Sequence, residues 1–218
     1  MQKLLLTCFL FAMTLAGLAP ASSLAVILFN PRNWSEGQLP ADWHLRVNRG
    51  KPDFRICQEG DTSSIRLKSA DSSFALERGV EVNPHETRYL TWTWKVTQLP
   101  AGGDFRRAAT DDQAAQLLVA FADRHVLAYI WDTSAPKGAG QSAGFLPLVR
   151  VFAIVCESGA AEAGRWVREA RDVAADYERA FGRPAPLVKG LRLQINAQHT
   201  GTAAESYFGE VAFRGALR

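Results

Sequence analysis

Alternation between apolar and polar residues predicts a chain built mainly from β-strands. In the clearest segment, residues 88–96, every second position from Leu90 to Val96 is leucine, tryptophan or valine, and the positions between them are threonine or lysine. Shorter strand-like segments recur between clusters of Gly, Pro and Asp. These segments cover residues 54–57, 64–69, 74–77, 191–197 and 207–213.

Three further segments, residues 114–122, 126–131 and 149–156, are apolar on both sides. Such segments are typical of central strands that are buried on two faces. Strands at short intervals with Gly- and Pro-rich turns predict an antiparallel, jelly-roll-like β-sandwich. A parallel α/β fold is disfavoured because it would need several helices between the strands. We expect one sandwich domain over residues 26–218.

One segment has a helical period. Between residues 161 and 181, apolar residues recur at spacings of three and four, at Trp166, Ala170, Val173, Tyr177 and Ala180. Gly182 and the prolines that follow it supply a stop signal. The pattern predicts one long amphipathic helix in the C-terminal third of the chain, laid across a face or edge of the sandwich.

The N-terminal residues have the pattern of a signal peptide. Lys3 is followed by an apolar run over residues 4–18, which is about 15 residues long and shorter than the ~20 that a membrane span needs. Small residues follow the run. We predict a signal peptide over residues 1–25, a periplasmic or secreted protein, and no membrane span after cleavage; an uncleaved membrane anchor is the alternative.

Charge and cysteine content narrow the classes of partner. The chain has 25 Lys and Arg against 22 Asp and Glu, interspersed along its length, so neither a nucleic-acid partner nor a polybasic membrane patch is indicated. Cys8 would leave with the signal peptide. An oxidising compartment would permit a disulfide between Cys57 and Cys156. Two separate buried thiols are the alternative.

A set of short motifs occurs in order along the chain: Trp92-Thr93-Trp94-Lys95-Val96, Tyr129-Ile130-Trp131-Asp132, Asp176-Tyr177 and Phe181-Gly182. Over roughly residues 29–213 the sequence resembles the bacterial family catalogued as domain of unknown function 3047. The resemblance implies an exported, single-domain protein and supplies no reaction. Where the family tends to carry Asp-x-Asp-x-Thr, this chain has Asn196-Ala197-Gln198-His199-Thr200, so the resemblance implies no metal site here.

All six tryptophans follow the predicted signal peptide, and aromatic faces can stack on sugar rings. Trp92 and Trp94 share the apolar side of their strand, so we expect them in the core. Trp166 and Tyr177 are expected to pack the helix against the sheet. Trp131 ends a strand beside a loop and is the candidate for ligand stacking.

Four carboxylates, Asp104, Asp111, Asp112 and Asp132, flank two predicted buried strands. If their loops meet, they form an acidic mouth that can accept hydrogen bonds from a ligand, bind Ca²⁺ through oxygen ligands, or supply an acid/base pair. The simpler alternative is that they cap turns by accepting bonds from backbone amides.

The remaining motifs argue against cofactor chemistry. The four histidines lack zinc-binding spacings, and no nucleophile elbow, phosphate loop or dinucleotide fingerprint is present. We therefore predict no resident cofactor, and Ca²⁺ at the acidic loops stays as the alternative. On the predicted helix, Arg171 can form a bidentate pair with a carboxylate and so serve as a structural tether. Asp176 lies nearby in the sequence.

The leading functional hypothesis is a non-catalytic periplasmic or cell-envelope protein that binds a glycan or a similar polar ligand. Trp131 would be the stacking platform, with Asp104, Asp111, Asp112 and Asp132 as hydrogen-bonding contacts. One alternative is a glycan-cleaving enzyme that uses two of these carboxylates. Another is an envelope assembly or scaffold protein that acts through an exposed sheet edge or apolar patch.

Overall fold

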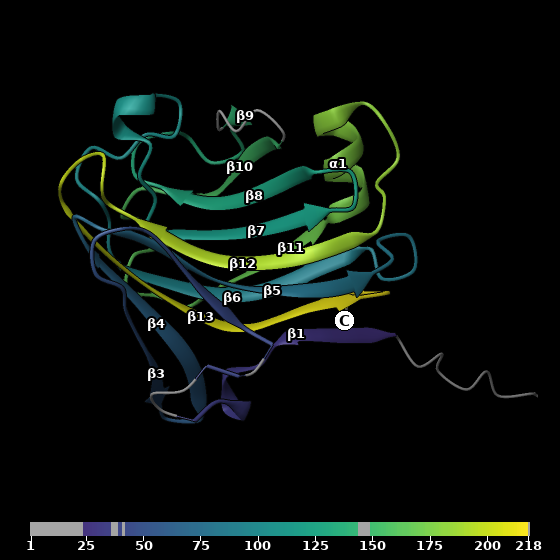
Figure 1. Cartoon of the computed structure of the whole chain (residues 1–218), viewed down its shortest axis with the longest axis horizontal. Helices are drawn as coiled ribbons and strands as arrows, with labels where there is room; N and C mark the ends of the chain where they lie inside the picture. The colour runs from purple at the N-terminus through teal and green to yellow at the C-terminus, as the bar shows by residue number, and fades with distance from the viewer. Residues whose placement is uncertain (1–23, 36–38, 41, 144–148, 218) are drawn as a thin grey trace, which may run out of the picture.

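The computed structural model describes residues 24–35, 39–40, 42–143 and 149–217. Within them the chain forms two β-sheets that enclose a shared hydrophobic core, with one short α-helix at the side (Figure 1). This arrangement confirms the predicted β-sandwich. The predicted signal peptide lies outside the described residues, apart from Leu24 and Ala25. No helix in the described part of the chain is long and apolar enough to cross a membrane.

The first sheet has six antiparallel strands in the order β11-β6-β13-β4-β3, and β1 pairs with the end of β13. The C-terminal strand therefore lies beside the N-terminal one (Figure 1). Its strands are β1 (Ala25–Phe29), β3 (Asp53–Glu59), β4 (Thr62–Ala70), β6 (Tyr89–Gln98), β11 (Val167–Asp172) and β13 (Ala203–Arg214).

The second sheet has seven strands in the order β2-β5-β12-β7-β8-β10-β9. All neighbours are antiparallel except β8 and β10, which run parallel. Its strands are β2 (His44–Arg49), β5 (Ser73–Val82), β7 (Ala115–Phe121), β8 (His125–Asp132), β9 (Gly140–Ala143), β10 (Arg150–Ser158) and β12 (Val188–Asn196).

The core is formed by the inward-facing half of each strand. On β6, Trp92 and Trp94 are fully buried, as the alternation predicts. Their rings meet aromatic rings of the second sheet: Trp92 lies 5.2 Å from Tyr129 and Trp94 lies 5.9 Å from Trp131, centroid to centroid. Aromatic contacts of this kind join the two sheets across the middle of the sandwich.

The predicted long helix is wrong in its first half. Residues 167–172 form β11, which pairs with β6, and α1 covers only Val173–Phe181. Asp172 is the N-cap of α1, where its side chain accepts a hydrogen bond from the Ala175 amide at 3.1 Å. Gly182, with φ of 70°, ends the helix in the left-handed conformation. Two 3₁₀ turns, Pro31–Asn33 and Ala108–Thr110, complete the described helical structure.

Arg171 and Asp176 tie this corner of the molecule together. Arg171 Nε and Nη2 donate to the two carboxylate oxygens of Asp176 at 2.8 and 2.6 Å. The Tyr129 hydroxyl donates to the same carboxylate at 3.1 Å. The fork therefore links β11 and α1 to β8, rather than joining two positions of one helix. Tyr177 on α1 is fully buried against Phe121, with ring centroids 4.5 Å apart.

The two cysteines after the predicted signal peptide are both free thiols. Cys57 is half-buried on β3, at the edge of the six-stranded sheet, and Cys156 is buried on β10 of the seven-stranded sheet. Of the two alternatives, the structure has the separate thiols: no bond joins Cys57 to Cys156. Burial raises the pKa of the Cys156 thiol well above its usual value.

Candidate functional site

Trp131 cannot serve as a stacking platform. Its side chain has no exposed surface, and its ring lies among the core aromatics beside Trp94. The indole Nε1 donates to the backbone oxygen of Gly159 at 3.0 Å. The prediction that Trp131 faces a ligand is therefore wrong. The residue is part of the inward-facing side of β8.

Asp132, the next residue, holds a loop together. It is fully buried, and its carboxylate accepts hydrogen bonds from three backbone amides: Phe105 at 2.9 Å, Ser134 at 2.8 Å and Ala135 at 2.7 Å. Burial raises the pKa of Asp132, and these amide hydrogen bonds oppose that rise. Its oxygens are directed at the backbone and are not open to a ligand.

Asp112 and Asp104 are used in a similar way. Asp112 is fully buried and accepts bonds from the backbone amides of His199 and Thr200 at 3.2 and 2.7 Å. Asp104 is nearly buried and pairs with Arg106, whose Nε and Nη2 donate at 2.7 and 2.9 Å. The predicted ligand contacts at both positions are therefore wrong, and the turn-capping alternative describes Asp112.

Asp111 is half-buried and accepts a bond from the Gln113 side chain at 2.9 Å; burial raises the pKa of Asp111. Beside it, Asn196 accepts hydrogen bonds from the Gln113 amide and from Gln116 Nε2 at 2.8 and 2.6 Å. The aspartates are close enough to raise one another's pKa, Asp112 and Asp132 that of Asp111, and Asp104 that of Asp132, but their oxygens accept bonds from the protein's own amide and guanidinium groups. Among the described residues, no group of three or more His, Cys, Asp or Glu side chains is arranged to hold a metal ion.

The better candidate site is a groove of about 410 Å³ across the outer face of the seven-stranded sheet. Its floor is a row of small and aliphatic residues in register: Gly79 on β5 pairs with Gly190 on β12, and Gly190 pairs with Ala120 on β7. Ala120 pairs with Val126 on β8, and Val126 with Val151 on β10. Since neighbouring strands are ~4.8 Å apart, the five-strand row is roughly 19 Å long.

The two glycines leave this part of the sheet face without side chains. A Cβ added to Gly79 would meet no heavy atom within 4 Å, whereas one added to Gly190 would lie 3.4 Å from the Cβ of Ala120. Neither glycine has a positive φ, so the backbone there does not require glycine. Glycine in a strand interior weakens the strand and often marks a place where something approaches the backbone closely. The pair leaves room above the sheet.

One half of the groove, over β2, β5 and β12, is lined by charged side chains. Glu77 is its central acceptor: it accepts hydrogen bonds from Arg192 Nε at 2.9 Å and from Arg46 Nε at 2.5 Å, and Arg46 stands beside the groove without lining it. Burial acts to raise the pKa of Glu77, but the two arginines outweigh it and hold that pKa below its usual value. Glu77 therefore stays a carboxylate fixed between two guanidinium groups.

Arg192 also leads into a chain of planar amide side chains. Arg192 Nη1 lies 3.5 Å from Gln194 Oε1, and Gln194 Nε2 donates to Gln116 Oε1 at 3.1 Å. Gln116 in turn donates to Asn196 at 2.6 Å. Each member restricts the rotamers of the next, so the donors and acceptors of the charged half are held in place before any ligand arrives.

The other half of the groove, over β7, β8 and β10, is aliphatic. Its lining residues are Leu118, Ala120, Val126, Val149 and Val151. All of them are half-buried. The groove thus changes along its length from charged to apolar.

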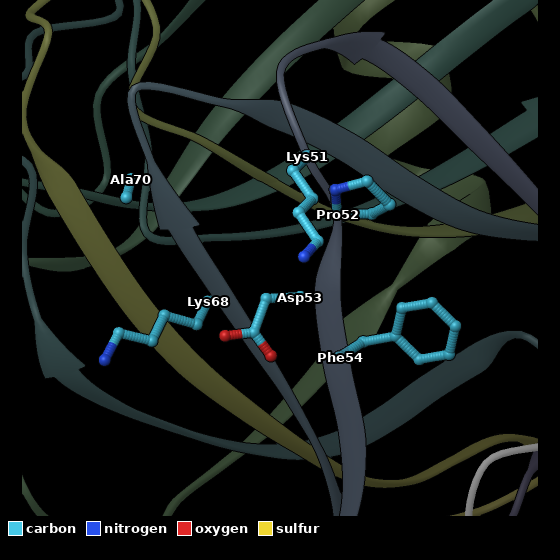
Figure 2. A pocket seen from close by; sticks show the side chains of 6 residues that line it. All are labelled: Lys51, Pro52, Asp53, Phe54, Lys68 and Ala70. Carbon is cyan, nitrogen blue, oxygen red and sulfur yellow. The ribbon is translucent and has the colours of Figure 1, made fainter.

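A second hollow, of about 440 Å³, lies where β3 begins and β4 ends. Figure 2 shows Lys51 extending toward the Asp53 carboxylate, with the Phe54 ring on the opposite side of the strand. Asp53 is already paired with Arg66, at 3.2 Å from Nη1. The remaining polar lining is Lys51 and Lys68, neither of which is buried or held in position to orient a ligand.

Trp166 lies on the outer face of the six-stranded sheet. The sequence predicted instead that it would pack a helix against the sheet. Its half-buried ring covers Lys95, whose Nζ is 5.1 Å from the ring centroid and 4.7 Å from that of Tyr207. Glu59 accepts from Lys95 Nζ at 2.7 Å and from Trp166 Nε1 at 3.0 Å. Lys95 Nζ, Trp166 Nε1 and the Glu59 carboxylate are all hydrogen-bonded within the cluster, so its role is to connect β3, β6 and the start of β11.

Sequence reasoning missed the groove residues, although a signal was present. The segments around Leu118, Val126 and Val151 are apolar on both sides, a pattern that predicts complete burial. In fact one side packs in the core and the other lines the groove. The pairing of Gly79 with Gly190 depends on strand register, which the sequence alone does not show.

A family model described as "Protein of unknown function (DUF3047)" matches residues 33–212. The chain belongs to the DUF3047 family. This match confirms the resemblance drawn from the ordered motifs. No curated protein matches this DUF3047 chain.

Solved structures similar to this DUF3047 protein include the xyloglucanase domain of NopAA from Sinorhizobium fredii, with 6% identity, a TM-score of 0.48, and coverage of 81% of this chain and 94% of that one. A family 11 carbohydrate-binding module of Clostridium thermocellum has 6% identity, a TM-score of 0.48, and coverage of 91% and 98%. Endoglucanase Cel12A from Rhodothermus marinus has 10% identity, a TM-score of 0.47, and coverage of 88% and 99%. At such identities the likeness is one of strand arrangement alone.

Proposed function

We propose that this protein is a non-catalytic saccharide-binding protein of the periplasm or cell envelope, and that its ligand lies in the groove on the seven-stranded sheet. The observation that carries the proposal is the fixed Arg46–Glu77–Arg192 cluster beside an open floor at Gly79 and Gly190. Saccharide hydroxyls both donate and accept hydrogen bonds, and this cluster offers both functions on planar, pre-oriented groups.

A binding role agrees better with the groove than hydrolysis does. Glycoside hydrolysis requires two carboxyl groups, one of them with a raised pKa. Among the described lining residues Glu77 is the sole carboxylate, and its arginine partners hold its pKa down. It therefore cannot donate a proton near neutral pH. A ligand would be held in this groove without being cleaved.

Filling the groove tests the proposal. Gly79→Leu adds a side chain where a Cβ meets open space, so the variant is expected to fold while its side chain occupies the groove. We expect its affinity for an envelope saccharide identified on a glycan array to fall by about tenfold or more, which corresponds to ~1.4 kcal/mol. Isothermal titration calorimetry measures the change.

Arg168→Leu is the matched control, because it adds leucine at an exposed strand position on the other sheet. It should bind like the wild type. Arg192→Gln should weaken binding without filling the groove, since it removes donors beside Glu77. A Gly79→Leu variant that is folded and binds as tightly as the wild type would remove the groove from consideration.

A further inference from the structure

The two halves of the groove differ in a way that a plain saccharide does not explain. Over β7, β8 and β10 all five lining residues are aliphatic. A saccharide chain lying along the whole groove would find no hydrogen-bonding side chain among the described lining residues over these three strands. Leaving a polar group unpaired against apolar surface is unfavourable. Only the charged half suits a sugar.

The aliphatic surface continues from a region that the protein covers with its own loops. Toward the other end of the same strands, Ala128, Ile130, Ala153 and Val155 form a second small hydrophobic cluster under Phe105 and Ala135. Leu118 and Val151 pack against this cluster and also line the groove. On β8 and β10 the outer face is therefore apolar from the groove to this cluster, and within the described residues the part at the groove is only half-covered.

The charged half has one positive charge in excess. Arg46 and Arg192 share the single carboxylate of Glu77. Each of the other two rim cations has its own partner: Arg78 pairs with Asp42, and Lys189 pairs with Glu81. The Arg192 side chain remains 37% exposed. An anionic group on a ligand would therefore be attracted to the Arg46–Arg192 end of the groove.

From these observations we infer that the ligand is an amphiphile: an acidic sugar headgroup lies over Glu77 and Arg192, and its alkyl or acyl chain lies over Val126 and Val151. The inference rests on the proposed saccharide-binding function and names the class of ligand for the same groove. The aliphatic half crosses three strands, which gives it a length of roughly 10 Å along the groove, so a short alkyl chain can lie along it. Charge complementarity fixes the direction of the ligand in the groove.

A homologous series of ligands tests the inference. Free glucuronate, hexyl glucuronide and octyl glucuronide are titrated below their micelle-forming concentrations into the chain that begins at residue 26. We expect the affinity to rise by up to about fourfold per methylene, the factor that corresponds to ~0.8 kcal/mol per buried CH₂. Octyl glucoside, which lacks the carboxylate, should bind more weakly than octyl glucuronide, and added salt should reduce the difference.

Variants locate the alkyl chain. Val126→Thr and Val151→Thr each replace one methyl group with a hydroxyl of similar size, so they should reduce the gain in affinity per methylene of the alkyl chain. Val47→Thr is the control, because Val47 is 48% exposed on β2 and does not line the groove. Circular dichroism before each titration verifies that the variants are folded.

The outcomes separate this inference from the proposed function. If free glucuronate and octyl glucuronide bind with equal affinity in the groove, the amphiphile inference is overturned and saccharide binding stands. If the alkyl ligands bind but Arg192→Gln and Gly79→Leu have no effect, the chain adsorbs elsewhere and the inference also fails. If no sugar binds with or without a chain, both proposals fall.

Discussion

At the scale of single residues, Glu169 carries a carboxyl group that is difficult to ionise. Burial on β11, and then repulsion by Glu157, raises the pKa of Glu169 to about 7 from an ordinary value near 4.5. Between these two pH values the folded state keeps a proton that the unfolded chain has lost. Raising the pH through this window therefore lowers the free energy of unfolding. We expect the protein to be more stable at about pH 5 than at about pH 8 through this group.

Glu169→Gln gives the comparison, because a glutamine cannot ionise. Urea denaturation of both proteins at the two pH values measures the free energy of unfolding. The loss on raising the pH should be smaller in the variant. Glu157→Gln should also reduce this loss of stability, because it removes the charge that repels the Glu169 carboxylate. It keeps Lys137, the partner of Glu157, which attracts that carboxylate. Identical pH dependence in wild type and Glu169→Gln would contradict the assignment.

Residue-scale prediction from the sequence succeeded where one side of a strand was apolar and the other polar. Trp92 and Trp94 were placed in the core for this reason. Trp131 lies in a strand that is apolar on both sides, so the pattern did not reveal which side its ring takes, and its position at the strand end suggested exposure. Trp166 was placed by a helical period that β11 does not follow.

At the scale of elements, the strand assignments were largely correct and the helix was too long. Trp166 and Ala170 fit a spacing of four, but both are even-numbered positions that also fit a strand. The inward-facing residues of β11 include Glu169 and Arg171, and these charges hid its alternation. Register across strands, which creates the groove, depends on tertiary pairing and has no local signal.

The boundary between β11 and α1 can be tested at Asp172. Asp172→Ala removes the N-cap acceptor of the Ala175 amide and the ion pair with Arg88. We expect the free energy of unfolding to fall by about 1 kcal/mol, the usual cost of losing an N-cap. Asp172→Asn keeps a capping oxygen and loses only the exposed ion pair, so its free energy of unfolding should fall by less. Equal losses in the two variants would show that the charge, and not the cap, sets the boundary.

At the scale of the whole molecule, the sandwich is held by its core and not by a covalent link between the sheets. A domain of this length buries ~70% of its unfolded surface, so it does not need a disulfide. We therefore expect a reducing agent to leave the Tm unchanged. In the chain that begins at residue 26, half-buried Cys57 should react with a thiol reagent in the native state, whereas Cys156 should react only after unfolding, because burial hides its sulfur and raises its pKa. Cys57→Ser should abolish the native reaction. A Tm that falls when reductant is added would mean instead that the two sheets are bridged in solution.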